Sequence, residues 1–228
     1  MGILTADIQD ATRAKLEAEL SGKIQLVLFS QEASRLVLPD ALRGQECLYC
    51  RETKQLVEEV AALSDKITLE VFDFTADKEK AAAYAIDKIP AIVVLPEDGR
   101  DLGIRFFGIP SGYEYTSLLE ALVDASRGTT GLAAGTRQAL AGLAKDVHIQ
   151  VFVTPTCPYC TTAVRLAHQF ALESPRVRGE MVEATEFPHL AQKYGVFGVP
   201  KTVMNESVTL DGAVPEAAFL EAVLKAGR

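Results

Sequence analysis

The order of apolar and polar positions in residues 1–127 predicts an alternation of helices and strands. Continuous apolar runs such as residues 24–29 predict strands that are buried on both faces. Stretches rich in Ala, Leu and Glu, with apolar side chains at helical spacing, predict amphipathic helices. An Asp98-Gly99 turn signal predicts a hairpin between the last two strands. The expected helices are 5–20, 49–63, 77–87 and 113–125, and the expected strands are 24–29, 67–74, 91–95 and 102–107.

Residues 128–228 repeat this order. A strand–helix–strand segment gives parallel strands and a hairpin gives antiparallel ones, so each half predicts an α/β unit with a mixed sheet and helices on both faces. The glycine-rich residues 126–135 read as a linker, which predicts two tandem units, 1–127 and 128–228. The second unit has expected helices at 136–144, 157–172, 188–194 and 215–226, and expected strands at 147–153, 180–184, 201–204 and 208–210.

All four cysteines of the chain take part in the repeat. They form two Cys-x-x-Cys pairs, Cys47-Leu48-Tyr49-Cys50 and Cys157-Pro158-Tyr159-Cys160. Each pair is followed, 43 residues after its first cysteine, by the proline of an apolar-Pro step, Ile89-Pro90 or Val199-Pro200. The same chemistry at a fixed offset of 110 residues indicates a duplicated unit. The first strands align at an offset of 125 instead, so the first unit carries about 15 extra residues, near 32–46.

Composition and charge exclude some classes of function. No apolar run approaches the roughly 20 residues that span a bilayer. The acidic first 20 residues lack the basic-then-apolar pattern of a secretory signal, so a cytoplasmic protein is expected. The net charge is −8, all of it in residues 1–127, and no basic stripe is present. Nucleic-acid binding depends on contacts between basic side chains and phosphates, so a nucleic acid is not an expected partner. A membrane is not an expected partner either, because no apolar run is long enough to span one.

A Cys-x-x-Cys pair at the start of a helix has a specific chemistry. The unpaired N–H groups and the positive end of the helix favour the thiolate of the first cysteine. We therefore predict Cys47 and Cys157 as nucleophiles, and Cys50 and Cys160 as the thiols that resolve the mixed disulfide. This thiol–disulfide exchange requires neither a cofactor nor a metal.

Two other interpretations of the cysteines compete with a redox role. Four thiolates can bind zinc, but zinc ribbons usually have about 15–20 residues between their pairs, whereas 106 residues intervene here. Permanent structural disulfides are unusual in a cytosolic chain, and a loop of two residues constrains little of the unfolded state. Redox-active pairs are the favoured interpretation.

The chain resembles the protein disulfide oxidoreductases built from two thioredoxin-fold units in tandem, a glutaredoxin-like family described mainly from thermophilic microbes. Cys-Pro-Tyr-Cys at 157–160 matches the glutaredoxin active-site sequence, and Ile89-Pro90 and Val199-Pro200 match the family's cis-proline step. The resemblance implies reduction, oxidation or isomerisation of protein disulfides, with electrons from a thioredoxin-reductase-like flavoprotein.

The same resemblance implies a set of substrate-binding residues. A cis X-Pro step exposes the backbone of the residue before the proline, which can pair with an extended peptide beside the nucleophile. Tyr49 and Tyr159 either contact substrate or cover the helix start. The implied substrate-binding residues are Ile89, Pro90, Val199, Pro200, Tyr49 and Tyr159.

The sequence departs from the family pattern in ways that separate the two pairs. The first pair has Leu48 in place of proline. A second departure is common to both pairs: neither strand before the cysteines carries a buried acid, so the proton acceptor is unassigned. Glu46 adjoins Cys47, whereas the uncharged Thr156 adjoins Cys157. A carboxylate disfavours a nearby thiolate, which predicts that Cys157 is the more reactive thiol. Residues 32–46 are expected to cover part of the first dithiol.

Three functions remain open on the sequence alone. The first is a dithiol–disulfide oxidoreductase that acts on protein disulfides. The second is an electron carrier between a flavoprotein reductase and a thiol peroxidase such as a peroxiredoxin. The third is a zinc-binding interaction protein. His168 lies about 12 Å along its helix from Cys160, too far for a general base, and we interpret it as a helix-face histidine.

Overall fold

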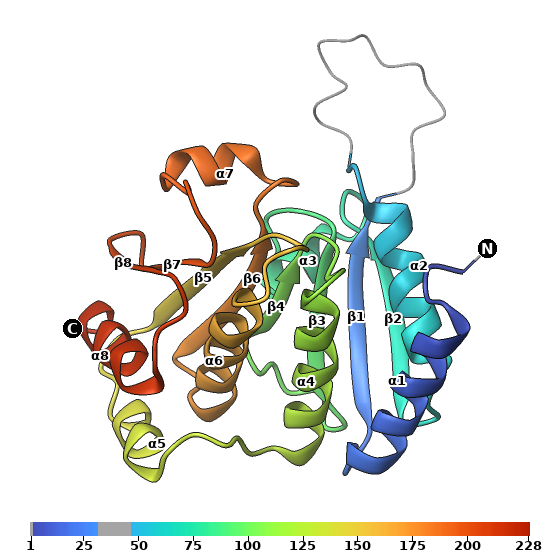
Figure 1. Ribbon diagram of the computed structural model, residues 1–228, viewed down its shortest axis with the longest axis horizontal. Coiled ribbons are helices and arrows are strands. Elements are labelled where there is room, and N and C mark those ends of the chain that lie inside the picture. The colour runs from blue at the N-terminus through green and yellow to red at the C-terminus, as the bar shows by residue number, and fades with distance from the viewer. Residues whose placement is uncertain (1, 32–46) are drawn as a thin grey trace, which may run out of the picture.

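The computed structural model describes residues 2–31 and 47–228, in two successive sets of helices and strands (Figure 1). The first set is α1 (Ala6–Glu19), β1 (Ile24–Ser30), α2 (Cys50–Ala61), β2 (Ile67–Asp73), α3 (Lys78–Ala83), β3 (Ala91–Pro96), β4 (Ile104–Phe107) and α4 (Glu114–Arg127). The second set is α5 (Ala134–Ala141), β5 (Val147–Val153), α6 (Cys160–Glu173), β6 (Val177–Glu183), α7 (Pro188–Lys193), β7 (Lys201–Met204), β8 (Val208–Asp211) and α8 (Glu216–Ala226).

Every helix and strand expected from the sequence has a counterpart, and the differences are at the element ends. Helix α3 ends at Ala83 instead of residue 87, because Ala85 adopts a left-handed conformation with φ of 52°. Strand β6 begins at Val177 instead of residue 180, because its pairing with β5 starts at Val147 and Val177. The extra segment 32–46 lies outside the described residues.

The eight strands of the described residues form one mixed sheet, in the order β2-β1-β3-β4-β6-β5-β7-β8. Within each unit the first two strands are parallel and the last two form antiparallel pairs, as predicted. The units meet where β4 pairs in parallel with β6, with Ile104 opposite Gly179 and Phe107 opposite Val182. The division of the chain at residues 127 and 128 stays a prediction; α4 ends at Arg127 and α5 begins at Ala134.

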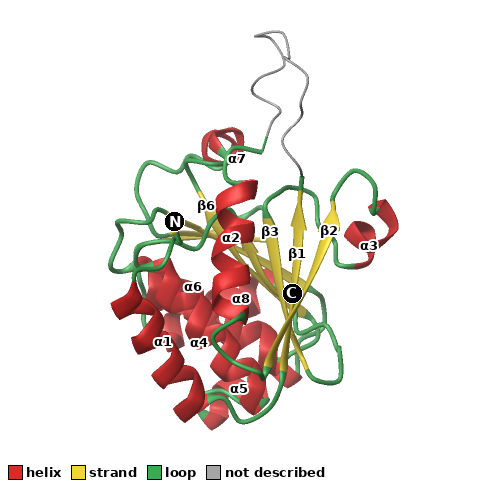
Figure 2. Cartoon of the chain, turned by 90° about the vertical axis from the view of Figure 1, so that its right-hand side faces the viewer, coloured by secondary structure: helices red, strands yellow, loops and turns green. Residues whose placement is uncertain are grey.

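The two faces of the sheet are covered unequally (Figure 2). Alternate strand residues point to opposite faces. Leu26, Leu28 and their counterparts pack in the larger core, with the apolar sides of α1, α2, α4, α5, α6 and α8. Val27 and Phe29 pack in the smaller core, with residues of and near the short helices α3 and α7. Helices on both faces were expected, and the five strands β1, β3, β4, β5 and β6 are buried almost throughout.

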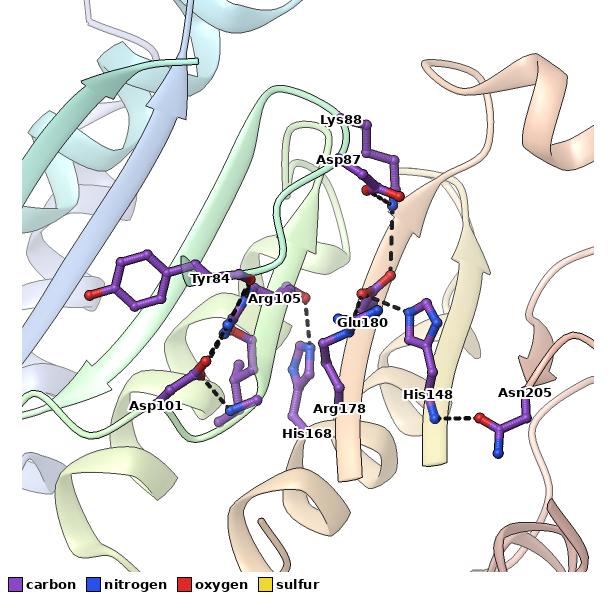
Figure 3. Close-up of polar contacts among 12 residues, drawn as sticks. Tyr84, Asp87, Lys88, Asp101, Arg105, His148, His168, Arg178, Glu180 and Asn205 are labelled. Carbon is purple, nitrogen blue, oxygen red and sulfur yellow. Dashed lines mark hydrogen bonds and ion pairs between the residues drawn. The ribbon is translucent and has the colours of Figure 1, made fainter. Parts of the chain in front are cut away.

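Charged side chains are buried at the seam between β4 and β6 (Figure 3). Glu180 on β6 is 1% exposed and contacts Lys88 Nζ at 3.7 Å, His148 Nε2 at 2.7 Å and Arg178 Nε at 2.8 Å. Burial works to raise the pKa of Glu180, but the His148 hydrogen bond and the surrounding cationic groups outweigh it and hold that pKa below its ordinary value. Because Lys88 directly precedes Ile89-Pro90, this ion pair ties a loop of the first unit to the second unit.

His168 lies on the buried face of α6, at the same seam. Its side chain packs against Phe106, with ring centroids 4.6 Å apart, and Nε2 lies 3.1 Å from the Arg105 carbonyl oxygen (Figure 3). Burial lowers the pKa of His168 to about 4, so the ring is neutral near pH 7. His168 therefore packs α6 against the seam and has no place in proton transfer at the cysteines.

Across the described residues, none of the helices has the length and apolar character needed to cross a membrane.

Candidate active sites

Both cysteine pairs are disulfides in the structure, at equivalent places in the two units. The Cys47–Cys50 bond has an S–S distance of 2.01 Å and the Cys157–Cys160 bond 2.23 Å, and the Cα atoms are 5.5 Å apart in both. One pair precedes α2 and the other precedes α6. We call the Cys47–Cys50 pair with Ile89-Pro90 the first site, and the Cys157–Cys160 pair with Val199-Pro200 the second site.

The helix at each site begins slightly later than the sequence suggested, α2 at Cys50 instead of residue 49 and α6 at Cys160 instead of Cys157. We expected Cys157 to open its helix, but Cys160 is the first residue of α6, with Tyr159 as its N-cap. In the first unit Cys50 opens α2 with Tyr49 as N-cap. Each pair thus bridges the loop and the helix, and the N–H groups of the first helical turn, which have no partner within the helix, lie at the disulfide.

The two cysteines of each pair differ in exposure. Cys50 is 2% exposed and Cys160 is fully buried, whereas Cys157 is 8% exposed and Cys47 is only partly buried. In both sites the first cysteine is the more accessible one. An incoming disulfide meets this sulfur before the second, which supports the predicted roles of nucleophile and resolving thiol.

A cis proline lies beside each pair, as the resemblance implied. The Ile89-Pro90 and Val199-Pro200 bonds are both cis. Cys157 Sγ lies 3.7 Å from the Val199 carbonyl oxygen. In the first site, Ile89 lines the same cavity as Cys47. The Val199 backbone therefore lies next to Cys157, and the first site brings Ile89 and Cys47 to one cavity.

The surroundings of the two sites differ in exposed apolar surface. At the second site Tyr159 is 70% exposed and Phe197, two residues before Val199, is fully exposed. At the first site Leu48 is 67% and Tyr49 42% exposed. The residue that corresponds to Phe197 at the offset of 110 is Asp87. Sequence reasoning missed Phe197, although its position beside an apolar-Pro step was a usable signal.

A cavity of about 440 Å³ opens at the first site between the two units. The first unit contributes Cys47 and the loop before the proline, and the second unit contributes the segment from β6 into α7. The lining residues are Cys47, Leu48, Asp87, Lys88, Ile89, Thr185, Glu186, Phe187, Pro188 and His189.

Glu114, the first residue of α4, is a buried carboxyl near the second site. It is 1% exposed, and neither of its oxygens has a hydrogen-bond partner among the described residues. The preceding Tyr113 N–H donates to the Pro155 carbonyl at 3.0 Å, and Ser117 lines a cavity together with Thr161 of α6. The first turn of α4 therefore lies beside the loop and helix that carry the second disulfide.

Burial raises the pKa of Glu114 to about 7, and the nearby Ser117 hydroxyl offsets only part of this effect. A carboxyl with such a pKa exchanges protons near neutral pH. No local pattern in the sequence predicts that Glu114 is buried with a raised pKa, because an acidic residue in the first turn of a helix is ordinarily exposed and stabilises the helix.

Part of the predicted difference between the sites lies outside the described residues. Glu46, which was expected to lower the reactivity of Cys47, and the segment 32–46, which was expected to cover the first dithiol, are both there. The greater reactivity of Cys157 stays a prediction. The structure adds the exposed aromatic groups at the second site as an independent difference.

Comparisons with known proteins agree with this two-unit arrangement. Residues 147–225 match the thioredoxin domain family. The thioredoxin of Methanocaldococcus jannaschii is 38% identical over 80 residues, which are 35% of this chain and 94% of that protein. The crystal structure of a protein disulfide oxidoreductase from Aeropyrum pernix superposes with a TM-score of 0.86 at 29% identity, covering 98% of this chain and 93% of the other.

The likeness also extends to a part of larger proteins. The F component of the alkyl hydroperoxide reductase of Xanthomonas campestris pv. phaseoli is 26% identical over 190 residues, which are 83% of this chain. The chain spans about a third of the length of that relative. The high identity over nearly a whole thioredoxin and the match of the two-unit fold confirm the resemblance drawn from the sequence: this chain belongs to the thioredoxin family.

Proposed function

We propose that the chain catalyses thiol–disulfide exchange on protein disulfides, with Cys157 and Cys47 as the attacking thiolates. This makes the chain a dithiol–disulfide oxidoreductase, which is the class that the cysteine pairs predicted. The likenesses to thioredoxin and to a protein disulfide oxidoreductase support this class. The observation that carries the proposal is the repeated arrangement: a first cysteine that is more exposed than the second, a buried second cysteine at a helix start, and a cis-proline step beside them.

Reduction of a substrate proceeds in two exchanges that conserve atoms and electrons. The Cys157 thiolate attacks one sulfur of the substrate disulfide, a mixed disulfide forms, and the other substrate sulfur leaves as a thiolate that takes up a proton. Cys160 then loses its proton and attacks Cys157 Sγ, which releases the second substrate thiol and forms the Cys157–Cys160 disulfide. Two electrons pass to the substrate. Cys47 and Cys50 perform the same steps at the first site.

The fold supports each step through a named feature. The free N–H groups of the first turn of α6 stabilise the Cys157 thiolate. The Val199 backbone, 3.7 Å from Cys157 Sγ at its oxygen, is placed to pair with an extended substrate segment. Tyr159 and Phe197 provide apolar surface around the nucleophile. We assign the proton that Cys160 gives up to Glu114, a buried carboxyl in the first turn of α4, which lies beside the loop and helix that carry the second disulfide.

A second candidate function is a relay that passes electrons from a flavoprotein reductase to a thiol peroxidase such as a peroxiredoxin. The likeness to the F component of alkyl hydroperoxide reductase over 83% of this chain favours it. The two functions share the chemistry and differ in the breadth of the acceptor. A thioredoxin-reductase-like flavoprotein is the proposed electron donor in both.

Insulin reduction by dithiothreitol tests the proposal without any partner protein. The wild-type chain is expected to accelerate the reaction, Cys157→Ser to reduce the acceleration strongly, and the double variant Cys47→Ser/Cys157→Ser to abolish it. A wild-type rate equal to that of dithiothreitol alone, combined with rapid turnover of a peroxiredoxin, would favour the dedicated relay. No acceleration with insulin or with a peroxiredoxin would reject both functions.

A further inference from the structure

The first site is completed by a carboxyl group that comes from the second unit. Glu186 lies between β6 and α7, yet it lines the same cavity as Cys47, Leu48 and Ile89. Sequence reasoning did not select it, because it lies in a short polar connection 139 residues after Cys47. Only the pairing of β4 with β6 brings this connection to the first site.

The carboxyl of Glu186 is held by the loop that follows β4. The Ile109 N–H donates to Glu186 Oε1 at 2.6 Å, and the neighbouring Gly108 N–H donates to the Pro90 carbonyl at 2.9 Å. Two successive backbone N–H groups thus connect Glu186 with the cis-proline step of the first site. The other oxygen, Oε2, is buried without a hydrogen-bond partner among the described residues.

The charged groups around Glu186 leave its carboxylate poorly stabilised. Glu183 on β6 is its acidic neighbour and accepts the Glu186 N–H at 2.7 Å through Oε2. From the first unit, Lys88 and Asp87 line the cavity, but Lys88 Nζ contacts Asp87 at 2.7 Å and Glu180 at 3.7 Å. Among the described lining residues, His189 is the remaining titratable side chain besides Cys47. Burial, and then the charge of Glu183, raise the pKa of Glu186 to about 7 despite the Ile109 hydrogen bond.

We propose that Glu186 is a positioning residue of the first site, and that its carboxyl group and the Cys47 thiol titrate as a coupled pair. Two acidic groups that line one cavity disfavour each other's ionisation, so the pair loses its protons in two linked steps. At low pH the neutral carboxyl leaves the Cys47 thiolate unopposed. Above neutral pH the carboxylate opposes it, so the second unit controls the nucleophile of the first. This inference rests on the proposed exchange chemistry for its role in turnover.

The test measures the alkylation rate of Cys47 against pH in the reduced full chain, with Cys157 and Cys160 replaced by Ser. Glu186→Gln keeps the shape and the acceptor for the Ile109 N–H but removes the charge. Its apparent Cys47 pKa is expected to fall by about one unit, which is a roughly tenfold rise in the thiolate fraction at a pH above the Glu186 pKa and below the Cys47 pKa. The wild-type profile should show two steps and the Gln variant one.

Two control variants separate an electrostatic role from a structural one. Glu186→Asp keeps the charge and is expected to restore a two-step profile, whereas Glu221→Gln, at an exposed position of α8, should leave the wild-type profile unchanged. Identical profiles for the wild type and Glu186→Gln would overturn the proposal, because a merely structural contact does not alter the shape of the titration.

A measurement on the unaltered carboxyl covers the case in which Glu186→Gln fails to fold. In the same Ser background, the carboxyl titration near neutral pH is followed by infrared difference spectroscopy in the oxidised and the reduced states. Coupling is reciprocal, so the carboxyl pKa must rise when the disulfide becomes a thiolate-forming dithiol. An unchanged pKa rejects the inference. Alkylation needs no disulfide substrate, so failure of insulin reduction alone rejects only the proposed function.

Discussion

Replacement of Glu114 by Gln should make the stability of the protein less dependent on pH. Glu114 is 1% exposed, without a hydrogen-bond partner for either oxygen among the described residues, and its pKa in the folded chain is about 7 against an ordinary value of 4.5. The unfolded chain therefore releases this proton at lower pH than the folded chain does. The stability associated with the neutral carboxyl is complete below about pH 4.5 and is lost as the pH rises through about 7.

The difference between the two pKa values corresponds to roughly 3 kcal/mol of unfolding free energy. Glu114→Gln cannot ionise, so it keeps this stability at alkaline pH. The variant should equal the wild type within about 1 kcal/mol in acid, and its advantage should grow by about 3 kcal/mol on going to pH 8. The gain concerns stability alone; if Glu114 accepts the Cys160 proton, the same variant should slow turnover at the second site.

Urea unfolding of the oxidised chain at several pH values measures this effect, since disulfide cysteines do not titrate and the slopes report any change in the exposed surface. Glu221→Gln, an exposed change on α8, serves as the matched control and should shift the unfolding free energy by less than about 0.5 kcal/mol at every pH. A stability difference between Glu114→Gln and wild type that stays constant with pH would show that Glu114 is ionised in the folded protein, and the reasoning would fail.

Three further substitutions test other contacts. Phe197→Ala removes a fully exposed side chain, so it should leave stability unchanged. It should lower kcat/KM for insulin about tenfold and leave kcat/KM for small disulfides unchanged. An equal loss with both substrates would contradict a docking role. Lys88→Met leaves the buried Glu180 with one cation fewer and should lower the unfolding free energy by about 2 kcal/mol. Lys193→Met, at an exposed ion pair, should leave the unfolding free energy nearly unchanged; equal effects of the two substitutions would show that burial is irrelevant. Gly108→Ala places a Cβ 2.6 Å from the Glu183 Cβ at a φ of 89° and should lower the free energy of unfolding by about 3 kcal/mol. Gly99→Ala, where the added Cβ meets no atom, should lower it by about 1 kcal/mol. Equal losses in urea unfolding would rule out the clash.

The sequence by itself determined the repeat and the local structure. Apolar runs such as residues 147–153 mark strands because a strand buried on both faces needs apolar side chains at nearly every position. The cysteine pairs and the Ile89-Pro90 and Val199-Pro200 steps are short motifs whose chemistry depends on a few adjacent residues. For the same reason the family, the mixed sheets and the exchange chemistry could all be derived before any coordinates.

Only the tertiary structure decided how the units join and which acids it buries near the two sites. The pairing of β4 with β6 is a contact between distant segments, and no periodicity within either segment records it. Glu114 and Glu186 look like ordinary surface acids in the sequence; each acquires a pKa of about 7 only because the fold buries it. Burial of this kind depends on atoms contributed from far along the chain, so it follows from packing and not from local pattern.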